Sequence, residues 1–230
     1  DNGKMSADAF KAALGRYYRT VHMADPKAMS ITQSTELGTV YSLDEIQALT
    51  SIAKTRDLKC HMDGARFANA LATLNVSPAD MSWRAGIDYL SFGATKNGAM
   101  AAEALIVFNP DDIKDLEWRR KRAGHLISKM RYVSAQLLAY VRDDLWLKNA
   151  RHANAMAKAI ADAAGERLVY PVEANEIFLR LSEAEKLSLR DQGFGFYDWG
   201  APGSEEVRLV TAWNSSEAEV QRFALALTAL

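Results

Sequence analysis

Asp63, Arg66 and Lys96 are three residues whose side chains can do chemistry together, in the stretches HMDGARFANA (61–70) and YLSFGATKNGAM (89–100). A lysine forms Schiff bases when its pKa is lowered. An ionised aspartate keeps a neighbouring pyridine nitrogen protonated, and the planar arginine fork binds a carboxylate or phenolate oxygen. Together the three side chains predict a site for pyridoxal phosphate, with Lys96 as its covalent anchor.

The residues around Lys96 are small, which leaves room for a bulky planar group. Gly93, Ala94, Gly98 and Ala99 flank the lysine, and glycine tolerates unusual backbone angles. Each signal is weak alone, because a lysine in such a loop is often solvated and Asp-Gly-x-Arg is often a turn with a surface ion pair. The order of strand, DGAR, second strand and TKNG is what favours a cofactor site.

Apolar segments with strand and helix periods alternate over the first half of the chain. They predict an α/β fold class with a largely parallel sheet. Ligands of such sheets bind beyond the carboxyl ends of the strands, so we expect Asp63 and Lys96 to meet at one edge. The predicted strands are 28–36, 58–63, 87–93 and 103–109, and the predicted helices between them include 42–57 and 66–75.

The pattern changes after about residue 111, and it divides the chain into three parts. Residues 1–115 are expected to form a large cofactor-binding α/β domain. Residues 116–165 have an almost wholly helical pattern and are expected to bridge the two domains. Residues 166–230 combine strand and helix patterns and are expected to form a small α+β domain.

Composition excludes several function classes. The chain of 230 residues has 28 Lys+Arg against 29 Asp+Glu, so nothing favours bulk binding to nucleic acid or to an anionic membrane. No apolar run reaches the length of a membrane span. The single cysteine, Cys60, excludes an internal disulfide and favours a reducing, cytoplasmic location. No Cys/His cluster has the spacing of a metal site, so no metal is expected.

Four stretches of the sequence predict a protein family as well as a site. In order and spacing, ITQSTELGTVYSLDEI, HMDGARFANALA, YLSFGATKNG and EVRLVTAW strongly resemble the low-specificity L-threonine aldolase family. That family belongs to the fold type I pyridoxal-phosphate enzymes, which have an aspartate-aminotransferase-like fold, within the β-eliminating lyase group. The resemblance covers essentially the whole chain, and the DGAR and TKNG blocks are its most specific parts.

The resemblance implies a role for each of five residues. Lys96 would bind the cofactor covalently, and Asp63 would pair with its pyridine nitrogen. Arg66 and Arg208 would bind the carboxylate of the amino-acid substrate, with Arg66 also close to the cofactor's phenolic oxygen. His22 falls at the spacing of a family histidine near the β-hydroxyl, although a histidine before a turn is often structural.

The resemblance also implies that this chain is the C-terminal two-thirds of such an enzyme. Family members carry an earlier segment with a phosphate-binding loop and a histidine that stacks on the ring. We expect the cofactor pocket to expose apolar surface where that segment would lie. Fold type I sites form at subunit interfaces, so a homodimer or homotetramer is expected.

The reaction implied by the resemblance is the cleavage of L-threonine, L-allo-threonine or a related β-hydroxy-α-amino acid to glycine and an aldehyde. One alternative is another fold type I reaction, such as β-elimination or transamination, because the Lys–Asp pair is common to all of them. The other is a non-catalytic fragment that keeps the fold without the cofactor.

Overall fold

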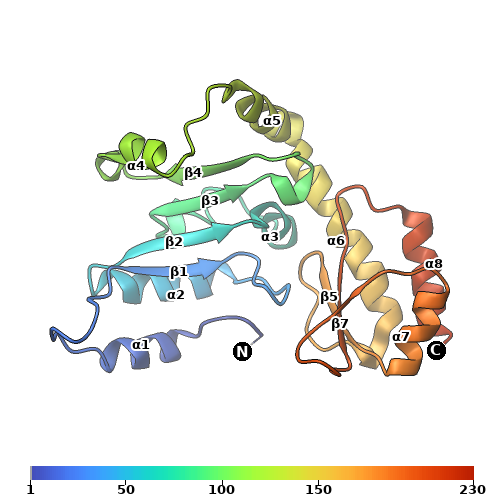
Figure 1. Cartoon of the computed structure of the whole chain (residues 1–230). Helices are drawn as coiled ribbons and strands as arrows, with labels where there is room; N and C mark the ends of the chain where they lie inside the picture. Colours follow the sequence, from blue (N-terminus) through green and yellow to red (C-terminus); the bar gives the residue numbers. More distant parts are fainter. Residues whose placement is uncertain (1) are drawn as a thin grey trace.

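The computed structural model describes residues 2–230, which form two β-sheets with helices around them (Figure 1). Sheet A has the order β1-β2-β3-β4, and sheet B has the order β5-β7-β6. The strands are β1 (Ala28–Thr32), β2 (Lys59–Gly64), β3 (Tyr89–Gly93), β4 (Glu103–Val107), β5 (Glu176–Arg180), β6 (Tyr197–Asp198) and β7 (Glu206–Val210). The α-helices are α1 (Ala7–Gly15), α2 (Leu43–Lys54), α3 (Phe67–Leu74), α4 (Leu116–Arg122), α5 (Arg131–Val141), α6 (Leu145–Ala164), α7 (Glu183–Asp191) and α8 (Glu217–Thr228).

Sheet A confirms the predicted α/β class with a mostly parallel sheet. The pairs β1–β2 and β2–β3 are parallel, whereas β4 runs antiparallel to β3. Parallel neighbours need a crossover connection, and α2 and α3 lie in these connections. The carboxyl ends of the three parallel strands therefore lie together at one edge of the sheet.

Helix α2 shows how local sequence sets the element boundaries. The Ser42 side chain accepts from the Glu45 backbone N–H, and the Glu45 carboxylate accepts from the Ser42 N–H. This capping box satisfies two backbone donors that the first turn leaves without helical partners. Ile46, Leu49 and Ala53 then form the buried stripe that packs on sheet A.

The two faces of sheet A differ in polarity. Strand alternation turns Met29 and Ile31, Cys60 and Met62, and Leu90 and Phe92 into the large apolar core. The intervening positions Ser30, His61, Asp63 and Ser91 face the other side, where they are exposed or half-buried. Sheet A thus has an apolar face covered by helices and a polar face that ends at Asp63.

Helix α6 joins the two sheets. Trp146 and Ala150 near its start belong to the core beneath sheet A, and Ala157 and Ile160 belong to a second core with sheet B and α8. In Figure 1, α6 runs from the end of α5 down behind β5 and β7. We call the part around the first core the large unit and the part around the second core the small unit.

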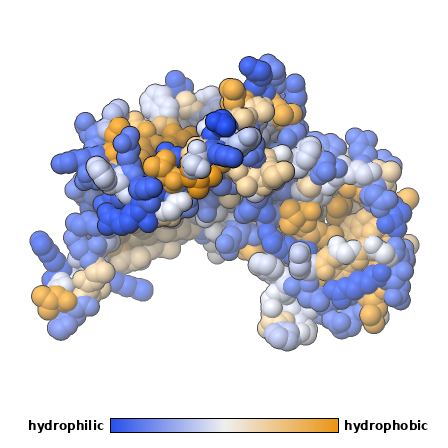
Figure 2. Space-filling model, turned by 45° about the horizontal axis from the view of Figure 1, so that its top comes forward, coloured by the Kyte–Doolittle hydropathy of each residue, from blue (hydrophilic) through white to orange (hydrophobic). Residues whose placement is uncertain are grey.

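Large apolar side chains are also exposed around α4. Figure 2 shows apolar side chains gathered between polar ones on the face that carries β4 and α4. The most exposed of them in this region is Trp118, at 72%. The others are Leu105, Ile113, Leu126 and Ile127. Over residues 2–230, the helices are all too short or too polar to cross a membrane.

Candidate functional site

Asp63 lies near the carboxyl end of β2, facing the polar side of sheet A. Its Oδ1 accepts a hydrogen bond of 2.9 Å from the Ala65 backbone N–H, which fixes the carboxylate at the start of the turn. Within residues 2–230 this carboxylate has no ion pair, and its side chain is half-buried. One carboxylate oxygen is thereby left for a cationic partner, which suits a pyridinium nitrogen.

Lys96 lies in a short 3₁₀ turn, Thr95–Asn97, that follows β3. The turn is held from below by Asn97, which is 3% exposed. The Asn97 Nδ2 donates to the Tyr140 hydroxyl at 2.7 Å and to the Trp146 carbonyl at 2.8 Å. Asn149 donates in turn to the Asn97 carbonyl. These bonds fix the turn on α5 and α6, while the Lys96 side chain is exposed and has no ion pair in the described part of the chain.

The turns that carry Asp63 and Lys96 are in close contact. A Cβ added to Gly93 at the end of β3 would lie 2.9 Å from the Ala65 Cα and 3.0 Å from its carbonyl oxygen. A Cβ on Gly64 would lie 2.8 Å from the Ser91 carbonyl oxygen. Both glycines are therefore required for the two strand ends to approach, and the structure brings Asp63 and Lys96 to the same sheet edge without a salt bridge between them.

Arg66 and Arg208 meet at a third residue, Glu176. The Arg66 Nη2 lies 3.1 Å from the Glu176 Oε1, and the Arg208 Nη2 donates to the same oxygen. The exposed fractions of the side chains are 0% for Glu176, 13% for Arg66 and 23% for Arg208. The two arginines predicted to share a substrate carboxylate are thus close together in space, although one belongs to each unit.

Burial makes this cluster electrostatically demanding. Burial lowers the pKa of the Arg66 guanidinium, the Glu176 carboxylate opposes that shift, and the nearby Arg208 charge adds to it. Arg66 follows Asp63 by three residues in the same turn, and the Asp63 charge also acts to raise the pKa of Arg66. Arg66 therefore joins the cluster to the turn that carries Asp63.

Two aromatic rings and a loop hold Arg208 in position. Its guanidinium carbon lies 5.1 Å from the centre of the Trp199 ring and 6.0 Å from that of Phe178. Beyond β7 the chain returns toward the Lys96 turn, because a Cβ on Gly98 would lie 3.5 Å from the Trp213 ring. Strand β7 and the loop after it therefore border the cluster on one side and the Lys96 turn on the other.

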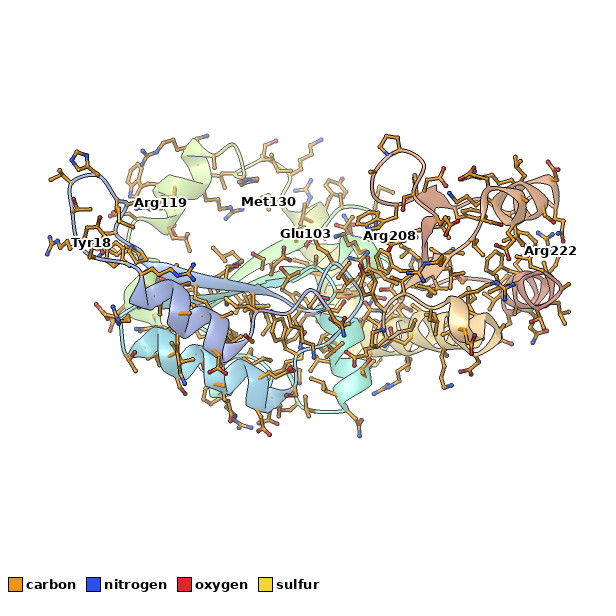
Figure 3. The ribbon with its side chains drawn as sticks, turned by 90° about the horizontal axis from the view of Figure 1, so that it is seen from below. Tyr18, Glu103, Arg119, Met130, Arg208 and Arg222 are labelled. Carbon is orange, nitrogen blue, oxygen red and sulfur yellow. The ribbon has the colours of Figure 1, made fainter. Side chains whose placement is uncertain are left out.

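His22 is not brought into this site by the fold of one chain. It lies in the exposed loop that precedes β1, at the amino edge of sheet A, whereas Asp63 and Lys96 lie at the carboxyl edge. Figure 3 shows Tyr18, in the same loop, at the opposite end of the sheet from Arg208. The sequence spacing gave no information on which edge the loop would occupy, so the geometry does not support His22 as a base within one chain.

His61 is a site-adjacent residue that sequence reasoning missed. Its Nδ1 lies 2.7 Å from the Ser30 Oγ and its Nε2 lies 2.9 Å from the Ser91 Oγ, so the ring bridges β1 and β3. The signal was present, because strand alternation puts His61 and Asp63 on one face. The side chains of Ser30, His61, Asp63 and Ser91 make this face of β1 to β3 polar. Exposed apolar side chains also lie next to the Lys96 turn, where Met100 is 89% and Trp213 is 43% exposed.

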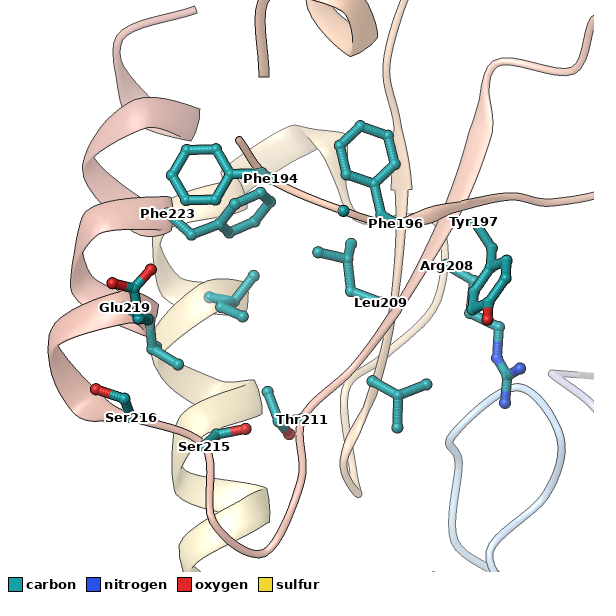
Figure 4. Close-up of a pocket in the computed structure, with 14 residues that line it drawn as sticks. Phe194, Phe196, Tyr197, Arg208, Leu209, Thr211, Ser215, Ser216, Glu219 and Phe223 are labelled. Atoms are coloured by element: carbon teal, nitrogen blue, oxygen red, sulfur yellow. The ribbon is translucent and has the colours of Figure 1, made fainter. Parts of the chain in front are cut away.

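A cavity of about 550 Å³ lies within the small unit, apart from the Lys96 turn. Apolar side chains, among them Phe194, Leu209 and Phe223, form much of its wall. Arg208 contributes to its edge, but Figure 4 shows the guanidinium turned away from the two phenylalanines. The cavity is therefore a neighbour of the arginine cluster and not the place where the predicted site residues converge.

Comparison with known proteins gives a family for this arrangement. Residues 1–184 match the family model described as β-eliminating lyase. The low specificity L-threonine aldolase of a Pseudomonas species is 41% identical over 235 residues, covering 100% of this chain and 67% of that protein. The Pseudomonas aeruginosa enzyme of the same name is 43% identical, covering 89% of this chain and 60% of that protein. The chain therefore spans about two-thirds of the length of these curated relatives.

Solved structures give the fold. A Leishmania major threonine aldolase superposes with a TM-score of 0.91 at 29% identity, covering 99% of this chain and 68% of that one. A serine palmitoyltransferase variant of S. paucimobilis with bound PLP superposes with a TM-score of 0.66 at 16% identity, covering 97% and 58%. The second likeness concerns the fold alone. The predicted fold type I architecture is confirmed.

Proposed function

This chain belongs to the β-eliminating lyase family, and we propose that the enzyme containing it cleaves L-threonine, L-allo-threonine or a related β-hydroxy-α-amino acid. The products are glycine and an aldehyde, and the cofactor is pyridoxal phosphate. The observation that supports this most is the meeting of Arg66 with Arg208 next to the edge that carries Asp63 and Lys96. The names of the Pseudomonas and Leishmania relatives support the same reaction.

The residues at the edge fit the cofactor. Lys96 offers an exposed amine on a turn that is fixed from below, so it can form a covalent bond without the backbone moving. Asp63 offers a carboxylate that is positioned by Ala65 and that makes no salt bridge with any described residue. When bound, the cofactor supplies an electron sink for the electrons of the bond that breaks.

The arginine cluster orients the substrate. Guanidinium groups at two points hold a carboxylate against rotation, and this fixes which bond at Cα stands perpendicular to the cofactor plane. Arg66 is placed by the DGAR turn and Arg208 by β7, so the substrate carboxylate is held between the two units. The base that removes the β-hydroxyl proton is not assigned, because His22 lies at the opposite edge of sheet A.

Three general features of the enzyme are also proposed, namely its oligomeric state, its location and its division into domains. The exposed apolar side chains around Trp118 support a homo-oligomer, a dimer or tetramer, in which this face is covered. The single, buried and free cysteine Cys60 supports a cytoplasmic location. The division at 1–115, 116–165 and 166–230 is supported by the two cores that α6 joins.

Product analysis on the full-length enzyme tests the reaction. With L-threonine and L-allo-threonine, we expect acetaldehyde and glycine in equal amounts, dependent on added pyridoxal phosphate. Formation of 2-oxobutyrate would instead indicate β-elimination, and formation of an oxo acid only with an added amino acceptor would indicate transamination. A protein that binds no cofactor at all would support the non-catalytic alternative.

A further inference from the structure

We propose that Glu176 is an internal carboxylate that holds Arg66 and Arg208 together and competes with the substrate carboxylate for them. The proposal rests on the proposed function only in taking the ligand of this pair to be an amino-acid carboxylate. Glu176 is a positioning residue, and the strength of its competition sets which anions the pair accepts.

The first step is the charge balance. Two guanidiniums that meet at one point repel each other, and burial increases the cost. Glu176 compensates one of the two positive charges, and because its side chain is fully buried, solvent screens that interaction little. The cluster is left with a formal charge of +1, which one substrate carboxylate neutralises.

The second step is the incomplete hydrogen bonding. Both arginines use the same Oε1, while the Glu176 Oε2 and the Nε atoms of Arg66 and Arg208 are buried without a partner. Buried polar atoms without partners are rare and costly. Because the two arginine Nε donors have no acceptor among residues 2–230, a second carboxylate can accept hydrogen bonds from them.

The third step is the placement of Glu176. It is the first residue of β5 and pairs with Val210 of β7, two positions along from Arg208. On its other side Glu176 packs against the loop between β1 and α2 of the large unit. A Cβ added to Gly38 in this loop would lie 3.0 Å from the Glu176 carbonyl oxygen and 3.1 Å from the Glu176 Cβ. The backbone and Cβ of Glu176 are thus held from both units, which limits how far its carboxylate can move when another anion enters.

The competition between Glu176 and the substrate carboxylate follows from the short distance between the two carboxylates. Two carboxylates that share the same guanidiniums lie about 5 Å apart, where an effective dielectric constant of about 20 gives a repulsion worth more than a tenfold change in affinity. Loss of the Glu176 charge with retention of its shape is therefore expected to tighten anion binding. A purely structural role would predict the reverse, because the arginines would separate.

The test is a titration of the full-length enzyme with acetate, used as the simplest carboxylate. The midpoint of thermal unfolding is followed against acetate concentration, with sodium chloride replacing sodium acetate so that ionic strength stays constant. For Glu176→Gln we expect the half-saturating acetate concentration to fall at least tenfold below that of the wild type. The control Glu217→Gln removes the same charge at an exposed position of α8 and is expected to change it less than twofold.

A second variant covers a failure of Glu176→Gln to fold. Glu176→Asp keeps the charge that compensates the arginines but withdraws it by one methylene, so its half-saturating concentration should lie below that of the wild type. Values equal to or above the wild type in whichever variant folds would overturn the proposal. The titration does not depend on turnover, so tighter acetate binding without threonine cleavage would leave this inference standing and remove the proposed reaction.

Discussion

Replacement of Asn97 by alanine is expected to loosen the Lys96 turn from beneath. Asn97 makes two side-chain hydrogen bonds in a buried place, one to the Tyr140 hydroxyl and one to the Trp146 carbonyl. Each net hydrogen bond contributes about 1 kcal/mol. The loss of both bonds is therefore expected to lower the free energy of unfolding by about 2 kcal/mol.

The assay is urea unfolding of the full-length enzyme, with Gln47→Ala as the control. Gln47 is an exposed amide on α2, and its loss should change the free energy of unfolding by less than about 0.5 kcal/mol. The same Asn97 variant should bind pyridoxal phosphate several-fold more weakly, because the anchor lysine is no longer held in one place. A loss of stability no greater than the control, or unchanged cofactor affinity, would refute this account of the turn.

Two further predictions concern the residues around Gly93, the last residue of β3. Burial raises the pKa of Tyr140 to about 12, so the neutral hydroxyl is favoured in the folded state. Its stabilising contribution is complete below pH 10 and is lost as the pH rises from 10 to 12; denaturant titrations at several pH values should show Tyr140→Phe losing stability less steeply in that window. Burial likewise raises the pKa of the Cys60 thiol to about 11. The part of the pH dependence that comes from Cys60 should therefore remain in the Tyr140→Phe variant. Separately, Gly93→Ala should cost about 1–3 kcal/mol in denaturant unfolding, because the added Cβ meets the Ala65 backbone; an unchanged midpoint would mean that the strand ends are not in contact.

The sequence predicted most of the sheet edge for a physical reason. The DGAR and TKNG turns follow strands whose apolar patterns are unambiguous, and parallel strands necessarily end at the same edge. The capping box of α2 was equally local, since Ser42 and Glu45 need only each other and the backbone. Features that depend on a few neighbouring residues can be predicted from those residues.

The features that the sequence did not predict depend on how distant segments meet. Glu176 reads as an ordinary residue of a strand, and only the packing of the small unit against the DGAR turn makes it the partner of two arginines. His22 was named from the resemblance alone, and the resemblance did not say that its loop would lie at the amino edge of sheet A in this chain. Long-range charge pairing and loop direction are set by tertiary packing, which a short motif does not contain.

The most direct test of the central claim is to locate the cofactor's covalent bond. The full-length enzyme is incubated with pyridoxal phosphate and reduced with borohydride, and its peptides are examined by mass spectrometry. We expect the pyridoxyl phosphate mass on the peptide that contains Lys96, and loss of both this label and the cofactor's absorption band in Lys96→Ala. A label on another lysine, or a labelled and fully active Lys96→Ala enzyme, would contradict the assignment of the site.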